Sequence, residues 1–435
     1  MHAGINYERY LAEIDVTDED MRSWKAKFWT DNKWLPSFSE ERSLDTTDED
    51  LRQRIFMSKQ DVAEAQAANP LANFSIMTPF SALTKEEFAT KVLNAYVHVN
   101  ITEPIAPAAP TRSLRDEETS SIASIQDLIN TLQKSIQEQT GESWTPGKVK
   151  PVLDTTANEV DTSIAKQVHW KQPTPVPAPL TQAPTAPTPA PEPKSATRPP
   201  VVEPVVKQDQ VSVQVEEPIA NTANSVDWST TPCGSPVQSQ GECGSCWAFA
   251  SVTAVESLEC IKLGQSKLNS YSKQQLITCD AKNMGCSGGA PAYAFDYIQK
   301  NGLCLESAYP YTLQKGGSTS CSTSCSKSQT GITGYEKLDE GDEAVLIDAL
   351  KLQPIVAAVA SGNAAWKQYT GGILSSCETS SLDHAVVIVG YDDTTIKIQN
   401  SWGEDWGEAG YIRLQRTSSS SGTCGLLEDM SRPTM

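Results

Sequence analysis

All eleven cysteines of this 435-residue chain lie between Cys233 and Cys424, and none precedes Cys233. Their spacing matches no common metal-binding motif, and so dense a set is typical of disulfides formed in an oxidising compartment. Ten cysteines can pair completely, which leaves one thiol free for chemistry. The pattern therefore predicts a disulfide-linked domain in the second half of the chain and a first half without disulfides.

Cys246 is the candidate for that free thiol, because it opens an apolar run whose spacing suits a buried helix. At a helix N-terminus, backbone N–H groups and the helix dipole favour the thiolate, which is the nucleophilic form of cysteine. Downstream, His384 lies at the start of an apolar strand and Asn400 follows the next one. Together these three side chains can attack a carbonyl carbon. The alternative is that Cys246 is half of a disulfide, and the odd number of cysteines argues against it.

Residues 240–247 read Gln-Gly-Glu-Cys-Gly-Ser-Cys-Trp and resemble the active-site motif of the papain-like cysteine proteases, the family that includes the lysosomal cathepsins. In that family the histidine and asparagine follow the cysteine by roughly 130 to 150 residues, as His384 and Asn400 do here. The resemblance continues in order at Val226-Asp227-Trp228, Gly285-Cys286-Ser287-Gly288-Gly289, Tyr309-Pro310-Tyr311, Gly371-Gly372-Ile373, Trp402-Gly403-Glu404-Asp405-Trp406-Gly407 and Cys424-Gly425-Leu426. It implies an α+β, papain-like two-lobe fold, with a helical left lobe and a β-barrel-like right lobe. Cys246 and His384 would face each other across the cleft.

The resemblance also assigns chemical roles. His384 would take the proton of Cys246, giving a thiolate and imidazolium pair, and would later protonate the leaving amine. Asn400 would fix the ring and tautomer of His384, and Trp402 would shield that hydrogen bond from water. Gln240 would donate its side-chain N–H to the oxyanion of the tetrahedral intermediate, together with the backbone N–H of Cys246.

Substrate binding is assigned in the same way. Gly288 and Gly289 have no side chains, so the backbone of an extended substrate can approach and pair with theirs. Asp429 would form the floor of the pocket for the residue two before the cut bond, where an acid admits Arg or Lys as well as apolar side chains. Alternatively, Asp429 is an exposed carboxylate near the C-terminus. The other residues assigned to substrate binding are Ala290, Pro291, Ala358, Leu382, Asp383, Ala385 and Trp406, of which Trp406 can equally be a core aromatic.

The resemblance implies three disulfides. Cys243 would pair with Cys286, Cys377 with Cys424, and Cys279 with either Cys321 or Cys325. The cysteines left over depart from the common family pattern, and their pairing stays open at this stage; they are Cys233, Cys260, Cys304 and one of Cys321 and Cys325.

Residues 1–102 are expected to form a helical domain that resembles the family's inhibitory propeptide, with helical spacing from about Asp20 to Tyr96. Asp48, Arg52, Phe56 and Asn69 match the long-helix motif of that propeptide, whereas Lys59 and Ala63 replace its Asn and Ile. Residues 80–84, Phe-Ser-Ala-Leu-Thr, resemble its next motif, with Ala82 in place of an acid. The alternative is a generic helical domain.

Residues 103–221 are expected to be a long linker. Within it, residues 119–138 have the pattern of an amphipathic helix, and residues 173–204 are a Pro/Thr/Ala-rich spacer that should be extended and solvated. Binding of the spacer to a proline-recognising partner is an alternative. Because an exposed, non-helical chain can be cleaved, an activating cut is expected between about residues 205 and 222. Residues 222–435 would be the peptidase domain.

Composition excludes some classes of partner. A net charge of -19 argues against nucleic acid, and no apolar run approaches the ~18 residues that span a bilayer. No signal peptide is visible at the start, yet the cysteines and the sequons at Asn73 and Asn100 favour the secretory pathway. We therefore expect a secreted or lysosomal/vacuolar protein, monomeric, with no metal or cofactor.

The function predicted from the sequence is the zymogen of a cysteine endopeptidase. It would hydrolyse peptide bonds through an acyl-enzyme after proteolytic removal of its N-terminal part. Its partners would be protein and peptide substrates and its own propeptide, acting as an intramolecular inhibitor. Two alternatives use the same residues: acyl transfer or ligation at this site, and an inactive protease-like binding protein.

Overall fold

The computed structural model describes residues 2, 4–30, 34, 44–93, 96–99, 224–322 and 324–435. The described residues within Met1–Thr102 and Val213–Met435 form one compact unit. The expected helix over residues 119–138, the spacer over 173–204 and the expected cut all lie outside the described residues. We call residues 2–99 the N-terminal segment and residues 224–435 the C-terminal domain.

The N-terminal segment is mainly helical, with α1 (Tyr7–Ala12), α2 (Ile14–Phe28), α3 (Leu44–Ala68), α4 (Lys85–Phe88) and a π-helical turn η1 (Ala89–Leu93). Its α2 and α3 pack through a small apolar core that contains Trp24, Leu51 and Ile55. Thr84 and Glu87 cap α4 through a capping box, which satisfies backbone N–H groups at the helix start. The helical spacing expected from about Asp20 to Tyr96 does not extend through β1 (Ala72–Phe74), which pairs antiparallel with a strand of the C-terminal domain.

The first part of the C-terminal domain is helical. It contains α6 (Cys246–Leu263), α7 (Lys273–Cys279) and α8 (Pro291–Asn301), with a short pair of strands, β3 (Leu303–Cys304) and β4 (Lys327–Ser328). The first fifteen residues of α6 are all buried, and the two carboxylates among them have partners, since Lys273 donates to Glu256 at 2.8 Å and Tyr271 donates to Glu259 at 2.9 Å. Gly264 ends α6 in the left-handed conformation that glycine adopts without strain.

The second part is built on a nine-stranded sheet, within the residues described, in the order β1-β7-β10-β9-β8-β6-β11-β5, with β2 also paired to β8. Its strands are β2 (Val226–Asp227), β5 (Gly334–Lys337), β6 (Ile355–Val359), β7 (Tyr369–Leu374), β8 (His384–Tyr391), β9 (Thr395–Gln399), β10 (Tyr411–Gln415) and β11 (Met430–Thr434). Short helices α9 (Glu343–Leu350), α10 (Ala364–Lys367), η3 (Trp228–Thr230) and η4 (Thr423–Gly425) connect them. The strand expected at His384 and the next one, expected before Asn400, are confirmed as β8 and β9.

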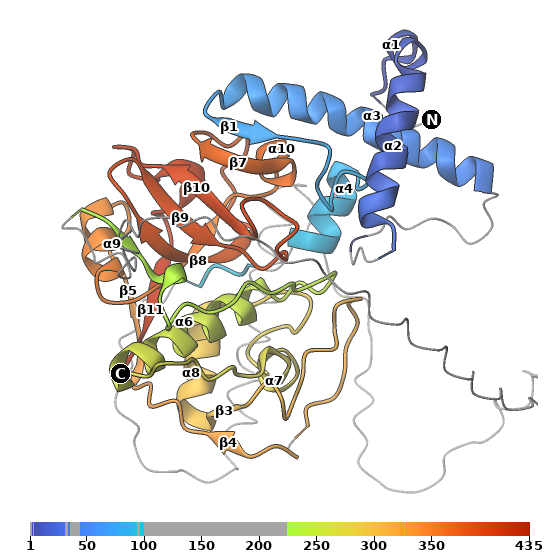
Figure 1. The fold of residues 1–435 in the computed structure, drawn as a ribbon. Helices are drawn as coiled ribbons and strands as arrows, with labels where there is room; N and C mark the ends of the chain where they lie inside the picture. Colours follow the sequence, from blue (N-terminus) through green and yellow to red (C-terminus); the bar gives the residue numbers. More distant parts are fainter. Residues whose placement is uncertain are drawn as a thin grey trace, which may run out of the picture. The chain divides into compact units, whose positions relative to one another are not determined.

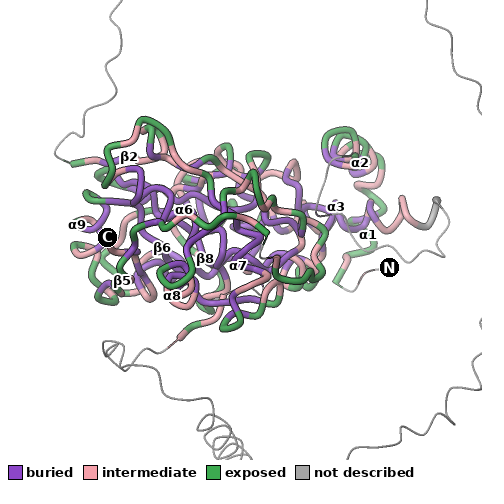
Figure 2. The backbone as a smooth tube through the Cα atoms, turned by 90° about the horizontal axis from the view of Figure 1, so that it is seen from below, coloured by how far each residue is buried: buried purple, intermediate pink, exposed green. Residues whose placement is uncertain are grey.

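The two parts meet where α6 packs against β8. Val252 and Val255 of α6 share one apolar cluster with Val387 and Val389 of β8. In Figure 1, α6 lies beside the sheet, and Figure 2 shows both α6 and β8 in the buried interior. This packing fixes the start of α6, and with it Cys246, against the start of β8.

Five disulfides link the C-terminal domain: Cys233–Cys260, Cys243–Cys286, Cys279–Cys321, Cys304–Cys325 and Cys377–Cys424. Cys279 is joined to Cys321, and the pairs that the sequence left open are Cys233 with Cys260 and Cys304 with Cys325. Each closed loop restricts the unfolded chain and stabilises the fold by about 2 to 4 kcal/mol. Cys246 is a free, buried thiol.

Candidate active site

The thiol of Cys246 lies at the first residue of α6, where unpaired backbone N–H groups converge. The backbone N–H of Ala385 donates a hydrogen bond to the Cys246 Sγ at 3.2 Å. Because Ala385 follows His384 on β8, this bond holds the thiol beside the imidazole. Helix and strand thus bring together two residues that are far apart in the sequence.

The imidazole of His384 is held on two sides. Its Nε2 shares a hydrogen bond of 2.7 Å with Oδ1 of Asn400, and its ring stacks on Trp402 with the ring centres 4.8 Å apart. Its Nδ1 is buried and has no hydrogen-bond partner within the described residues. If Nε2 carries the proton that Asn400 accepts, Nδ1 is the basic nitrogen that can take the proton of a thiol.

Gln240 is positioned by the residue that follows the asparagine. The hydroxyl of Ser401 donates to Oε1 of Gln240 at 2.7 Å, and the backbone N–H of Gln240 donates to the Ser401 carbonyl at 2.8 Å. This orients the side-chain Nε2 as a donor. It donates to the carbonyl oxygens of Val92 at 3.2 Å and Cys243 at 3.1 Å.

Val92 belongs to the N-terminal segment, so the amide expected to bind an oxyanion is occupied by a carbonyl of the same chain. The segment continues along the cleft, where the Val97 N–H donates to the Gly289 carbonyl at 3.0 Å and Tyr96 forms a parallel bridge with Gly289. Gly289 leaves no room for a side chain, because an added Cβ would lie 2.7 Å from the Trp247 ring.

Burial keeps the catalytic pair neutral in this structure. Burial raises the pKa of the Cys246 thiol to about 12, although the Ala385 N–H acts in the opposite direction. Burial also lowers the pKa of His384 to about 4, although the bond to Asn400 raises it. Between those values the covered pair is a thiol and a neutral imidazole. The expected thiolate and imidazolium pair is therefore a prediction for the uncovered site only.

The structure brings some of the expected substrate-binding residues to one pocket and leaves others outside it. A cavity of about 30 Å³ is lined by Ala290, Pro291, Ala358 and Asp429 together with Tyr96. The Asp429 side chain is only 13 % exposed, so it is not an exposed terminal carboxylate. Gly288, Leu382, Asp383, Ala385 and Trp406 do not line this cavity.

Two of those residues have other contacts. The Asp383 carboxylate accepts from the backbone N–H groups of Ser361 at 2.8 Å and Gly362 at 2.9 Å. Trp406 is fully buried, stacks on Trp366, and donates its ring N–H to the Trp366 carbonyl at 2.9 Å. Asp383 and Trp406 therefore contact neighbouring residues of the C-terminal domain, and neither lines the substrate pocket.

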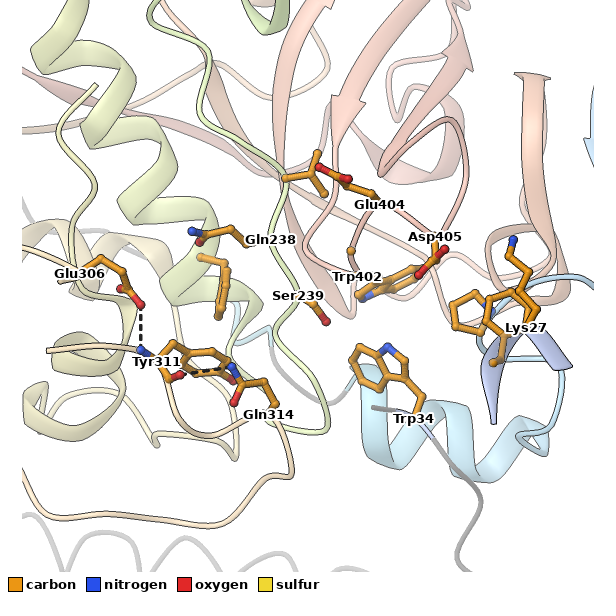
Figure 3. Close-up of a pocket in the computed structure, with 15 residues that line it drawn as sticks. Lys27, Trp34, Gln238, Ser239, Glu306, Tyr311, Gln314, Trp402, Glu404 and Asp405 are labelled. Atoms are coloured by element: carbon orange, nitrogen blue, oxygen red, sulfur yellow. Dashed lines mark hydrogen bonds between the residues drawn. The ribbon is translucent and has the colours of Figure 1, made fainter. Parts of the chain in front are cut away.

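A second cavity, of about 500 Å³, was not foreseen. It lies beside Trp402, and Phe28 and Trp34 of the N-terminal segment line it together with Ser239 and Glu404 (Figure 3). The one hint of this cavity in the sequence was that Ser239, which lines it, directly precedes Gln240.

Among the described residues no group of His, Cys, Asp or Glu is placed to hold a metal ion, and no described helix is long and apolar enough to cross a membrane.

Comparison with known proteins agrees with this geometry. The family model described as "Papain family cysteine protease" matches residues 222–434. The chain is 41% identical over 219 residues to the senescence-specific cysteine protease SAG12 of Arabidopsis thaliana, covering 48% of this chain and 62% of that protein. It is 39% identical over 227 residues to vignain of Ricinus communis, covering 50% of this chain and 61% of that protein. The chain thus spans about three fifths of the length of these curated relatives.

Solved structures of cysteine proteases are also similar to this chain. The cysteine protease CMS1MS2 of Carica candamarcensis is 39% identical, with 98% of that chain and 48% of this one covered and a TM-score of 0.46. The proform of Amb a 11, a ragweed pollen cysteine protease, is 22% identical with a TM-score of 0.59, covering 100% of this chain and 89% of that one. Residues 222–434 therefore match the papain family of cysteine proteases, and the chain as a whole has the fold of the Amb a 11 proform.

Proposed function

We propose that this chain is the latent precursor of a cysteine endopeptidase, and that the N-terminal segment is its intramolecular inhibitor. The observation that supports this most strongly is the occupation of the Gln240 amide by the Val92 carbonyl of the N-terminal segment. A carbonyl at that donor has the place that the oxyanion of a substrate would take. A peptide cannot reach the site until the segment leaves.

In the uncovered enzyme, His384 takes the Cys246 proton and the thiolate attacks the carbonyl carbon of the cut bond. Gln240 and the backbone N–H of Cys246 stabilise the oxyanion. His384 then protonates the leaving amine, and water hydrolyses the acyl-enzyme to release the second product and restore the thiol. Asn400 keeps the imidazole in the tautomer that the first step requires.

Activation requires removal of the segment, and we propose that the cut lies between about residues 205 and 222. We also propose a secreted or lysosomal/vacuolar location and a monomeric enzyme that acts on protein and peptide substrates. The five disulfides, all in the C-terminal domain, support an oxidising compartment.

The test is incubation of the full chain at pH 4 to 6 under mild reducing conditions, with mass loss and peptide cleavage followed together. We expect the wild-type chain to shorten and to become active. Cys246→Ala should stay full-length, and after trimming by an added protease it should remain folded but inactive. Activity of trimmed Cys246→Ala, or transfer of the acyl group to an added amine in preference to water, would refute the proposal.

A further inference from the structure

The carboxylate of Asp429 accepts hydrogen bonds from two side chains of the N-terminal segment. The Tyr96 hydroxyl donates to its Oδ2, and His98 Nδ1 lies 2.8 Å from the same oxygen. The carboxylate is thus a buried acceptor whose partners both come from the part of the chain that activation removes.

Tyr96 enters the pocket from a backbone that is paired with the enzyme. Its bridge to Gly289 fixes where its side chain begins, and the pocket beyond it contains the small apolar side chains of Ala290 and Ala358. Only about 30 Å³ stays open with Tyr96 in place, which is room for no more than a few water molecules. A phenol ring therefore fills this pocket and brings its hydroxyl to the carboxylate.

The hydrogen bonds that the structure gives this carboxylate come from Tyr96 and His98, although the side chains of Tyr335 and Ser431 also line the pocket. Lys337 also lines the pocket, but its Nζ is paired with Glu340 at 2.8 Å. Burial, and after it the Asp429 charge, raise the pKa of Tyr96, so the phenol keeps its proton and stays a donor. Once the segment leaves, a largely buried carboxylate loses both partners, and leaving such a group unpaired is costly.

We propose that the processed enzyme prefers tyrosine as the residue two before the cut bond, and that Asp429 is the residue that selects it. This inference rests on the proposed function and names its substrate class. Phenylalanine would fill the same pocket but would donate no hydrogen bond to Asp429. Arginine would supply a donor, but its charge must be desolvated among apolar side chains. A site built to bind a hydroxyl discriminates strongly against the analogue that lacks it.

The test uses fluorogenic peptides that differ only at this position, with Tyr, Phe, Leu or Arg, and the enzyme obtained by processing the full chain. The wild type should show a kcat/KM ratio of Tyr to Phe of about 10 or more, as expected for a hydrogen bond to a charged group. Asp429→Ala should bring this ratio to about 1, and Asp429→Asn, which keeps an acceptor, should retain an intermediate value. Asp348→Ala, which removes an exposed acid elsewhere, is the matched control and should keep the wild-type ratio.

Because both peptides are measured on the same enzyme, a general loss of folding does not change the ratio. A Tyr to Phe ratio near 1 in the wild type would overturn the inference, and so would a high ratio that survives Asp429→Ala. A preference for Arg over Tyr that depends on Asp429 would also overturn it, and would favour selection of positive charge. Each of these three results would leave the endopeptidase function standing, because Leu or Arg peptides would still be cleaved. Failure to cleave any peptide would refute the proposed function and this inference together.

Discussion

At the scale of single residues, burial determines the protonation states of the two catalytic side chains. Cys246 and His384 are both fully buried, and burial without a charged partner favours the neutral form of each. The geometry needed for catalysis is already present, since Asn400 holds His384 at 2.7 Å and Ala385 holds Cys246 at 3.2 Å. The precursor is therefore latent because its catalytic side chains are buried and substrate cannot reach them. Activation does not require these side chains to move far.

Gln240→Ala tests the oxyanion donor in the processed enzyme. We expect kcat to fall by about 10² to 10³, because one preorganised donor is lost. The alkylation rate of Cys246 should stay close to wild type, since alkylation forms no oxyanion. Gln299→Ala, an exposed glutamine on α8, is the control and should match wild type in both measurements. Equal loss of alkylation and hydrolysis would contradict the assigned role.

At the scale of elements, the N-terminal segment is held by an aromatic contact and by a buried ion pair. Phe80 and Phe88 pack edge to face on Trp402, with ring centres 5.1 and 5.6 Å apart. In addition, Lys367 of α10 lies 3.4 Å from Asp61 of α3, and the two side chains are only 3% and 9% exposed. The first contact joins the segment to Trp402, on which His384 stacks, and the second joins it to α10.

Phe80→Ala should weaken latency. Removal of a fully buried phenylalanine costs about 3 to 5 kcal/mol, and here the lost contacts include those to Trp402. We expect the precursor to expose its thiol at neutral pH, measured as faster alkylation of Cys246 before any processing. Tyr7→Ala, at a 52% exposed position of α1, should leave the rate unchanged. A Phe80→Ala precursor as unreactive as wild type would show that this contact does not hold the segment.

Asp61→Ala should destabilise the precursor more than removal of the whole pair. It leaves the buried Lys367 ammonium without its carboxylate, which costs about 3 to 5 kcal/mol. Burial lowers the pKa of Lys367, which shows that its charge is costly there. We expect the double variant Asp61→Ala/Lys367→Met to recover part of the loss, measured by urea unfolding in the Cys246→Ala background. Asp348→Ala, which removes an exposed partner of Lys351, should change stability by less than about 1 kcal/mol.

The elements that sequence could predict are those fixed by local patterns. The apolar runs of β6 and β9 and the helix after Cys246 were readable because burial requires apolar side chains. The strand β1 was not, because its three residues have a partner only in β7, far along the chain. The same limit applies to the site. Motif spacing indicated Gln240 and His384, but no local pattern could show that Val92 occupies Gln240 or that Tyr96 contacts Asp429.

At the scale of the whole molecule, the closed precursor is linked to pH through His384. The pKa of this histidine is about 4 in the closed structure and about 6.5 in an unfolded chain. The closed state therefore disfavours the proton, and its advantage is fully present above about pH 6.5 and is lost as pH falls toward 4. Acid should favour opening of the segment.

The linkage can be measured by urea unfolding of the Cys246→Ala precursor at pH 7 and pH 4.5. We expect the precursor to lose about 2 to 3 kcal/mol through His384 between these values. Other groups titrate in the same range, so the comparison is with Cys246→Ala/His384→Asn. Between pH 7 and pH 4.5, the free energy of unfolding of that variant should fall by about 2 to 3 kcal/mol less than that of Cys246→Ala. Identical losses in the two proteins would contradict the linkage.

The most direct test of latency through burial is the rate at which iodoacetamide alkylates Cys246 at pH 7, before and after removal of the N-terminal segment. The thiolate is the reactive form, so an uncovered thiolate and imidazolium pair should react at least about 100-fold faster than the covered neutral thiol. We expect that increase on trimming, with mass spectrometry placing the label on Cys246. Equal rates in the precursor and the trimmed enzyme would show that the segment does not silence the thiol.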